Sequence, residues 1–191
     1  MNKFFIEIGS SDFDTLLPLA ENGWSGIVVE PVTELLDNLD IHTNVVYENL
    51  AILDKDGIST IRFCDPKRIP DTEKWMRGIG NVTQVNHFWE GAAVTQIMVK
   101  RDVRTITLDT LIKKYNVSKI DFLKIDTEGS EWVILKDYSW IVKPTFMKVE
   151  TVHWPTHEKY FKTEIFRTME TVLQKNDYIV YYEKNDLYAI R

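Results

Sequence analysis

The stretch Ile120–Glu131 reads IDFLKIDTEGSE and decides the fold class. Its first seven residues are mostly apolar and end on Asp126, which predicts a buried strand that stops at an acidic group. A polar loop, Thr127-Glu128-Gly129, comes next, and the apolar residues after it are spaced as in a short helix. A buried strand that leads through a short loop into a helix is the repeating unit of a parallel α/β sheet.

The same succession of strand, loop and helix recurs on both sides of this stretch. FFIEI at residues 4–8 is another buried strand. The helix after it must start near Asp14 or Thr15, because Pro18 fits only in a first turn. Apolar periodicity and turn residues assign the remaining elements. They are a strand at 26–30, a helix from Pro31 to Leu39, an apolar run at 44–53, a strand at 58–63, renewed order at 94–103, a helix over 108–115, a strand at 146–152, a helix at 158–175, and strands at 178–182 and 187–190.

These elements predict one α/β domain over residues 1–191, built on a mostly parallel, doubly wound sheet. The last two strands flank residues 183–186, EKND, which is a hairpin signal, so one strand at the end of the sheet must be antiparallel. Residues 65–92 lack periodicity, and irregular segments of this length in compact domains are usually functional. We expect this segment to form a lid. Its candidate substrate contacts are Trp75, His87 and Trp89.

Composition limits the partners that the chain can take. The formal net charge of −6 opposes a phosphate backbone, so we expect a small neutral or cationic substrate and no nucleic acid. Cys64 is the only cysteine, which excludes an intrachain disulfide and suits a reducing compartment. No apolar run approaches the roughly 18 residues of a membrane span, and Glu7 comes too early for a signal peptide. We therefore expect a soluble, cytoplasmic protein without a membrane partner; oligomerisation stays open.

Polar residues follow nearly every predicted strand at its carboxyl end. Parallel sheets bind ligands at this edge, where the strand order reverses. The residues at this edge are Glu7, Gly9, Ser10 and Ser11 after the first strand, Glu30 and Pro31 after the second, Asn49 and Ala51 after the third, Asp126 and Glu128 after the fourth, and Glu150 and His153 after the fifth.

The cofactor follows from the first two of these strand ends. Glu30 precedes a helix directly, where a carboxylate can accept both hydroxyls of a ribose. The loop GSSDFD at 9–14 lacks the G-x-G-x-x-G pattern that bares a helix N-terminus to a pyrophosphate. Asp12 and Asp14 would repel a diphosphate but suit a ligand with an ammonium and a sulfonium, which describes S-adenosylmethionine (SAM). The residues expected to bind SAM are Glu7, Gly9, Ser10, Ser11, Glu30, Pro31, Asn49, Ala51 and Asp126.

Five segments together resemble the FkbM-type methyltransferases. They are FIEIG at 5–9, VVEP at 28–31, TLD at 107–109, IDFLKIDTEGSE at 120–131 and FMKVE at 146–150. The resemblance implies a Rossmann-like class I methyltransferase fold, with a seven-stranded sheet and a terminal hairpin. It also implies SAM-dependent O-methylation, for which sugar and polyketide hydroxyls are the acceptors known in the family.

A hydroxyl is a poor nucleophile until a positioned base takes its proton. The expected catalytic residues are Asp126, Glu128 and His153, each with an alternative role. Asp126 could hold the methionine ammonium, Glu128 could cap the following helix, and His153 could be a packed loop residue. Asp126, Glu128 and Glu150 could also hold Mg²⁺, but no ligand spacing requires one, so we expect no metal.

Other functions stay open at this point. A non-catalytic SAM-binding module would keep the cofactor residues without turnover. A NAD-dependent oxidoreductase conflicts with the missing glycine pattern, and a nucleic-acid O-methyltransferase conflicts with the acidic charge.

Overall fold

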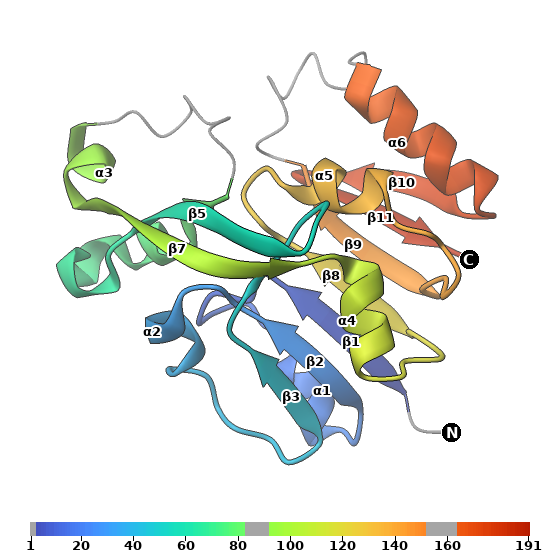
Figure 1. Ribbon diagram of the computed structural model, residues 1–191, viewed down its shortest axis with the longest axis horizontal. Coiled ribbons are helices and arrows are strands. Elements are labelled where there is room, and N and C mark those ends of the chain that lie inside the picture. The colour runs from blue at the N-terminus through green and yellow to red at the C-terminus, as the bar shows by residue number, and fades with distance from the viewer. Residues whose placement is uncertain (1–2, 83–91, 152–163) are drawn as a thin grey trace.

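The computed structural model describes residues 3–82, 92–151 and 164–191. Within them, a mixed sheet of seven strands has the order β10-β11-β9-β8-β1-β2-β3 (Figure 1). The parallel strands are β1 (Phe4–Ile8), β2 (Ser25–Val29), β3 (Val45–Glu48), β8 (Phe122–Ile125) and β9 (Phe146–Glu150), and the antiparallel hairpin is β10 (Ile179–Glu183) with β11 (Asp186–Ile190). The predicted α/β fold, with a mostly parallel seven-stranded sheet and a C-terminal antiparallel hairpin, is confirmed.

The strand order places the switch point between β1 and β8. From β1 the chain continues outward through β2 and β3, and it later returns to the other side of β1 with β8 and β9. The loops after β1 and β8 therefore leave in opposite directions and open a crevice at their carboxyl ends.

Helices cover the two faces of this sheet because alternate strand residues point to opposite sides. Ile6 and Ile8 of β1 pack in the core cluster that contains Leu111, Leu135 and Leu173. These three residues belong to α4 (Leu108–Lys114), α5 (Glu131–Lys136) and α6 (Glu164–Lys175). Phe5 points the other way and packs in the cluster that α1 (Leu17–Glu21) and α2 (Thr33–Leu36) complete.

The helix after β1 begins later than the sequence predicts. We expect its start near Asp14 or Thr15, but α1 starts at Leu17, with Pro18 in its first turn. The reason is local: Asp14 has a φ of 51°, outside the helical region, and the Leu16 backbone N–H donates to the Glu7 carboxylate at 2.8 Å. The loop after β1 therefore extends to Leu16, two residues beyond the predicted end.

A second sheet is the feature that the sequence-based account misses. Its four strands have the order β4-β7-β5-β6, and β5 pairs with β7 along its whole length (Figure 1). The strands are β4 (Ala51–Ile52), β5 (Gly57–Cys64), β6 (Gly80–Asn81) and β7 (Met98–Ile106). The apolar run at 44–53 thus divides between two sheets, because β3 ends at Glu48 and β4 pairs with β7 instead.

The predicted lid segment, residues 65–92, contains short regular elements. They are η1 (Pro66–Arg68), η2 (Asp71–Gly78), β6, and the start of α3 (Ala92–Ile97). His87, Trp89 and His153 lie outside the described residues, as do positions 158–163 of the predicted last helix. None of the helices in the described part of the chain combines the length and apolar character that crossing a membrane requires.

Candidate functional site

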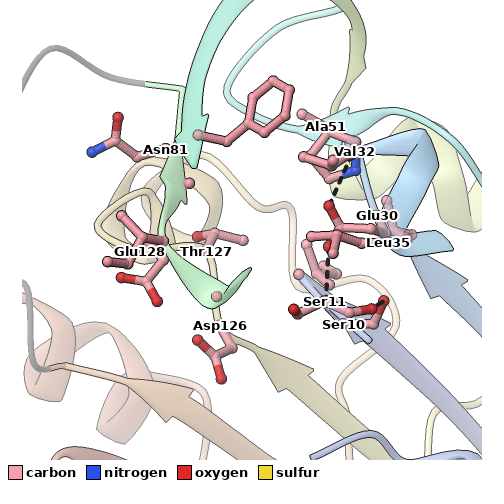
Figure 2. Close-up of a pocket in the computed structure, with 18 of the residues that line it drawn as sticks. Ser10, Ser11, Glu30, Val32, Leu35, Ala51, Asn81, Asp126, Thr127 and Glu128 are labelled. Atoms are coloured by element: carbon pink, nitrogen blue, oxygen red, sulfur yellow. Dashed lines mark hydrogen bonds between the residues drawn. The ribbon is translucent and has the colours of Figure 1, made fainter. Parts of the chain in front are cut away.

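A cavity of about 410 Å³ opens at the carboxyl ends of β1, β2 and β8. Its walls come from the loops after these strands, and its roof comes from η2, β6 and the inner face of β5. Its position is the switch point of the first sheet, and its volume is within the roughly 300–1,000 Å³ of small-molecule sites. Figure 2 shows Glu30 and Ala51 on one side of this cavity and Glu128 and Asn81 on the other.

Glu30 is a buried carboxylate of the cavity wall that the backbone holds in place. Its side chain is buried, and both oxygens accept backbone hydrogen bonds, from Ser11 N at 2.9 Å and from Val32 N at 2.8 Å (Figure 2). Burial raises the Glu30 pKa to about 7, and the two backbone donors limit the rise. Each carboxylate oxygen keeps a second lone pair, so Glu30 can accept two further hydrogen bonds from a bound diol.

The loop after β1 passes very close to the loop after β8. Gly9 has a φ of 78°, and a Cβ atom at this position would lie 1.8 Å from the Asp126 carbonyl oxygen. Only glycine therefore fits here, and its absent side chain lets the two loops share one wall of the cavity. The next two residues line this wall, and the Ser11 hydroxyl is buried without a hydrogen-bond partner among the described residues.

Three carboxylates gather at the end of the cavity opposite Glu30. Asp126, Glu128 and Glu150 each place one oxygen atom within 4.8 Å of the other two. Burial, followed by the charges of Asp126 and Glu128, raises the Glu150 pKa far above its ordinary range, and the Glu150 carboxyl shares a hydrogen bond with Asp126. The Glu150 carboxyl therefore favours its protonated form, as expected for a buried carboxyl beside other acidic groups.

The cluster of Asp126, Glu128 and Glu150 can do two different kinds of chemistry. It can accept hydrogen bonds or a proton from a hydroxyl, and it can attract an ammonium or sulfonium. Carboxylates at such a spacing also suit a divalent cation. The expectation that the site needs no metal stays a prediction.

The roof of the cavity carries the described part of the predicted lid. Trp75, Arg77 and Asn81 line the cavity, as does Gly78, whose backbone packs against Phe13. Arg77 makes an ion pair with Asp12, at 2.7 Å between Nη1 and Oδ2. Trp75 is half exposed at the cavity rim, where it is available to a ligand.

The ion pair between Arg77 and Asp12 corrects the role that the sequence predicts for Asp12. Asp12 and Asp14 were expected to repel a diphosphate, but the Asp12 carboxylate is engaged by Arg77 and does not line the cavity. Asp14 does line the cavity, and the other negative charge that faces a ligand comes from Asp126 and Glu128.

Most of the predicted cofactor residues come together in this cavity. Those that line it are Gly9, Ser10, Ser11, Glu30, Pro31, Ala51 and Asp126. Glu7 and Asn49 lie outside the lining. Glu7 is buried beneath the loop after β1, and Asn49 Nδ2 donates to the Glu30 carbonyl oxygen at 2.9 Å. Of the residues expected to be catalytic, Asp126 and Glu128 line the cavity, and His153 lies outside the described residues.

Five polar residues of the lining carry no predicted role. They are Arg77, Asn81, Lys124, Thr127 and Asn185. Lys124 is in the stretch that decides the fold, so a lysine within an otherwise apolar strand was a usable signal. Asn185 belongs to the turn of the hairpin, and no local pattern places that turn beside the β9 end.

The comparisons with known proteins agree with this geometry. The family model of the methyltransferase FkbM domain matches residues 5–180. No curated protein and no solved structure matches the chain. The matched region contains β2, β3, β8 and β9 of the first sheet in full and β1 from Phe5 on, but only the first two residues of β10. It includes every residue of the cavity lining except Asn185. The chain therefore belongs to the FkbM methyltransferase family.

Proposed function

We propose that this methyltransferase uses SAM and transfers its methyl group to a hydroxyl oxygen of a sugar or another small molecule. The fold we assign is the Rossmann-like class I arrangement. The observation that carries the proposal is Glu30, a buried carboxylate fixed by two backbone N–H groups, with one acceptor site free on each oxygen. Such a group suits the two hydroxyls of a ribose.

The opposite end of the cavity supports SAM over a dinucleotide. The Asp126 and Glu128 carboxylates there would repel a pyrophosphate, and the loop after β1 offers no helix N-terminus to hold one, because α1 begins only at Leu17. An ammonium and a sulfonium would instead be stabilised by Asp126 and its neighbours. When bound, SAM supplies a methyl group on a positively charged sulfur.

The chain's own contribution is to hold the acceptor and to take its proton. Asp126 and Glu128 line the cavity where an acceptor would approach, and either carboxylate can accept the proton that the hydroxyl loses. His153 stays a candidate for the same role. The negative charge favours a neutral or cationic acceptor, and Trp75 at the rim offers a flat apolar surface for the C–H face of a sugar ring.

The charge of the site and the single cysteine of the chain favour particular partners and a particular compartment. Because the charge at the site is negative, we propose no nucleic-acid substrate, and we propose no membrane partner. We place the enzyme in the cytoplasm, where its single cysteine needs no oxidising environment.

Thermal unfolding with added SAM tests the cofactor. A ligand at 100 times its dissociation constant stabilises a protein by about 2.7 kcal/mol. For a chain of this length that corresponds to a rise in Tm of about 5–10 °C. NADH at the same concentration should give no rise, and a rise with NADH alone would favour the oxidoreductase alternative.

Methyl transfer to a panel of sugars and glycosides tests the reaction. We expect a methyl ether product with at least one acceptor. SAM binding without turnover on any acceptor would favour the non-catalytic SAM-binding module.

A further inference from the structure

Lys124 is a charged residue in the middle of a buried strand. It belongs to β8, in the centre of the first sheet, and its side chain is only 4% exposed. A buried ammonium is strongly unfavourable unless acidic groups or carbonyl oxygens surround it. Its partners therefore show what this position does.

Its closest carboxylate partner is Glu7 of the neighbouring strand β1. The distance from Lys124 Nζ to Glu7 Oε1 is 3.1 Å, and the Glu7 side chain is fully buried. The other Glu7 oxygen accepts the Leu16 backbone N–H at 2.8 Å. One carboxylate thus links Lys124 to the end of the loop after β1.

Lys124 also holds this loop directly. Its ammonium donates a hydrogen bond to the backbone carbonyl oxygen of Asp14, whose φ of 51° turns the chain toward the sheet. The start of the same loop is fixed separately, because Gly9 N–H donates to the Val29 carbonyl oxygen at 2.9 Å. Both ends of the loop that lines the cavity are therefore tied to strands, one of them through Lys124 and Glu7.

The same ammonium faces the acidic end of the cavity. Lys124 Nζ lies 3.9 Å from Asp126 Oδ2, and Lys124 itself lines the cavity. Its remaining carboxylate neighbour, the exposed side chain of Asp14, lies at 3.7 Å. The single positive charge of Lys124 thus contacts both the loop after β1 and Asp126, the carboxylate that we expect to face the sulfonium.

We infer that Lys124 and Glu7 are positioning residues, which set the course of residues 9–16 and the orientation of Asp126 so that the cavity can bind SAM. This inference rests on the proposed function. It gives Glu7 an indirect role in place of the direct cofactor contact expected from the sequence. It also explains why a lysine occupies a strand position where an apolar residue would bury at no electrostatic cost.

A buried ion pair that serves only stability would behave differently. Replacing both partners of such a pair by apolar side chains of similar volume is often neutral or stabilising. If Lys124 and Glu7 only stabilise the fold, the double variant Glu7→Leu/Lys124→Met should keep wild-type SAM affinity. If they position the loop, the double variant should fold and lose affinity.

The test is isothermal titration of SAM into the full chain, with Tm recorded for each protein. We expect Glu7→Leu/Lys124→Met to bind SAM at least tenfold more weakly than wild type. The matched control is Lys143→Met/Asp177→Asn, which removes an ion pair of the same 3.1 Å length at an exposed site away from the cavity. Its SAM affinity should stay within twofold of wild type.

A second variant covers the case in which the double variant does not fold. Glu7→Gln keeps the size of the side chain but must give up one of its two contacts, because its amide cannot accept from both Lys124 and Leu16. We expect a three- to tenfold loss of SAM affinity, with faster hydrogen exchange at the Leu16 amide. Wild-type affinity in Glu7→Gln, or in the folded double variant, overturns the inference. Absence of SAM binding by the wild type overturns the proposed function instead.

Discussion

Replacing Glu30 by glutamine tests the assignment of the ribose site. The wild-type carboxylate has four acceptor sites, of which the Ser11 and Val32 N–H groups occupy one on each oxygen. The amide keeps one oxygen and presents an NH₂ group in place of the other. That NH₂ group faces a backbone donor and can no longer accept a hydroxyl.

The expected loss follows from these contacts. A hydrogen bond to a charged acceptor contributes about 1.5–3 kcal/mol, and the variant loses at least one of the two to the ribose. We therefore expect SAM to bind roughly 10- to 150-fold more weakly to Glu30→Gln. Glu30→Ala should lose more, because Ser11 and Val32 N–H would both lose their partner.

Isothermal titration at pH 8 measures this loss. The matched control is Glu21→Gln, which makes the same chemical change at an exposed glutamate of α1 and should bind SAM within twofold of wild type. If folded Glu30→Gln also binds SAM within twofold of wild type, the ribose does not contact Glu30 and the reasoning is refuted.

Three further predictions concern the pH dependence of stability, the close approach of Gly9 to Asp126, and the need for a metal ion. The Glu30 pKa is about 7 in the folded chain and about 4.5 unfolded, so the folded state binds more protons between these values. Relative to Glu30→Gln, the wild-type free energy of unfolding should fall by on the order of 3 kcal/mol as pH rises through this window, measured by urea unfolding. A difference between the two proteins that does not change with pH would contradict the raised pKa of Glu30. Gly9→Ala should cost about 2 kcal/mol or more and abolish SAM binding, since its Cβ would meet the Asp126 carbonyl oxygen, whereas Gly23→Ala, with open space around it, should cost less and keep SAM binding. EDTA should leave methyl transfer unchanged, and a loss that Mg²⁺ restores would show that Asp126, Glu128 and Glu150 hold a metal.

The first sheet could be predicted because its strands carry local signals. Short apolar runs that end on glycine or an acidic residue identify β1, β2 and β8, and the turn residues before Asp186 identify the hairpin. The residues of the cavity wall could be predicted from the same signals, because the carboxyl ends of parallel strands meet at one edge of the sheet.

The second sheet could not be predicted in the same way. β4 is only two residues long, and its pairing with β7 joins positions more than fifty residues apart. No local pattern encodes such a pairing, so the apolar run at 44–53 reads as one strand. The roof of the cavity depends on this sheet, and the contact of Arg77 with Asp12 was missed for the same reason.

The role of Glu7 shows a second limit of the sequence. Its position at the end of β1 predicts a ligand contact, but alternate strand residues point to opposite faces. Glu7 does not line the cavity, and its carboxylate contacts Lys124, a partner 117 positions along the chain. The sequence therefore places the carboxylate at the correct edge of the sheet without showing what it contacts.

A crystal structure with S-adenosylhomocysteine, the demethylated form of the cofactor, tests the central claim most directly. We predict that both ribose hydroxyls lie within about 3.2 Å of the Glu30 oxygens. The sulfur should point toward Asp126 and Glu128. A nucleoside bound elsewhere, or with its ribose turned away from Glu30, would contradict the account.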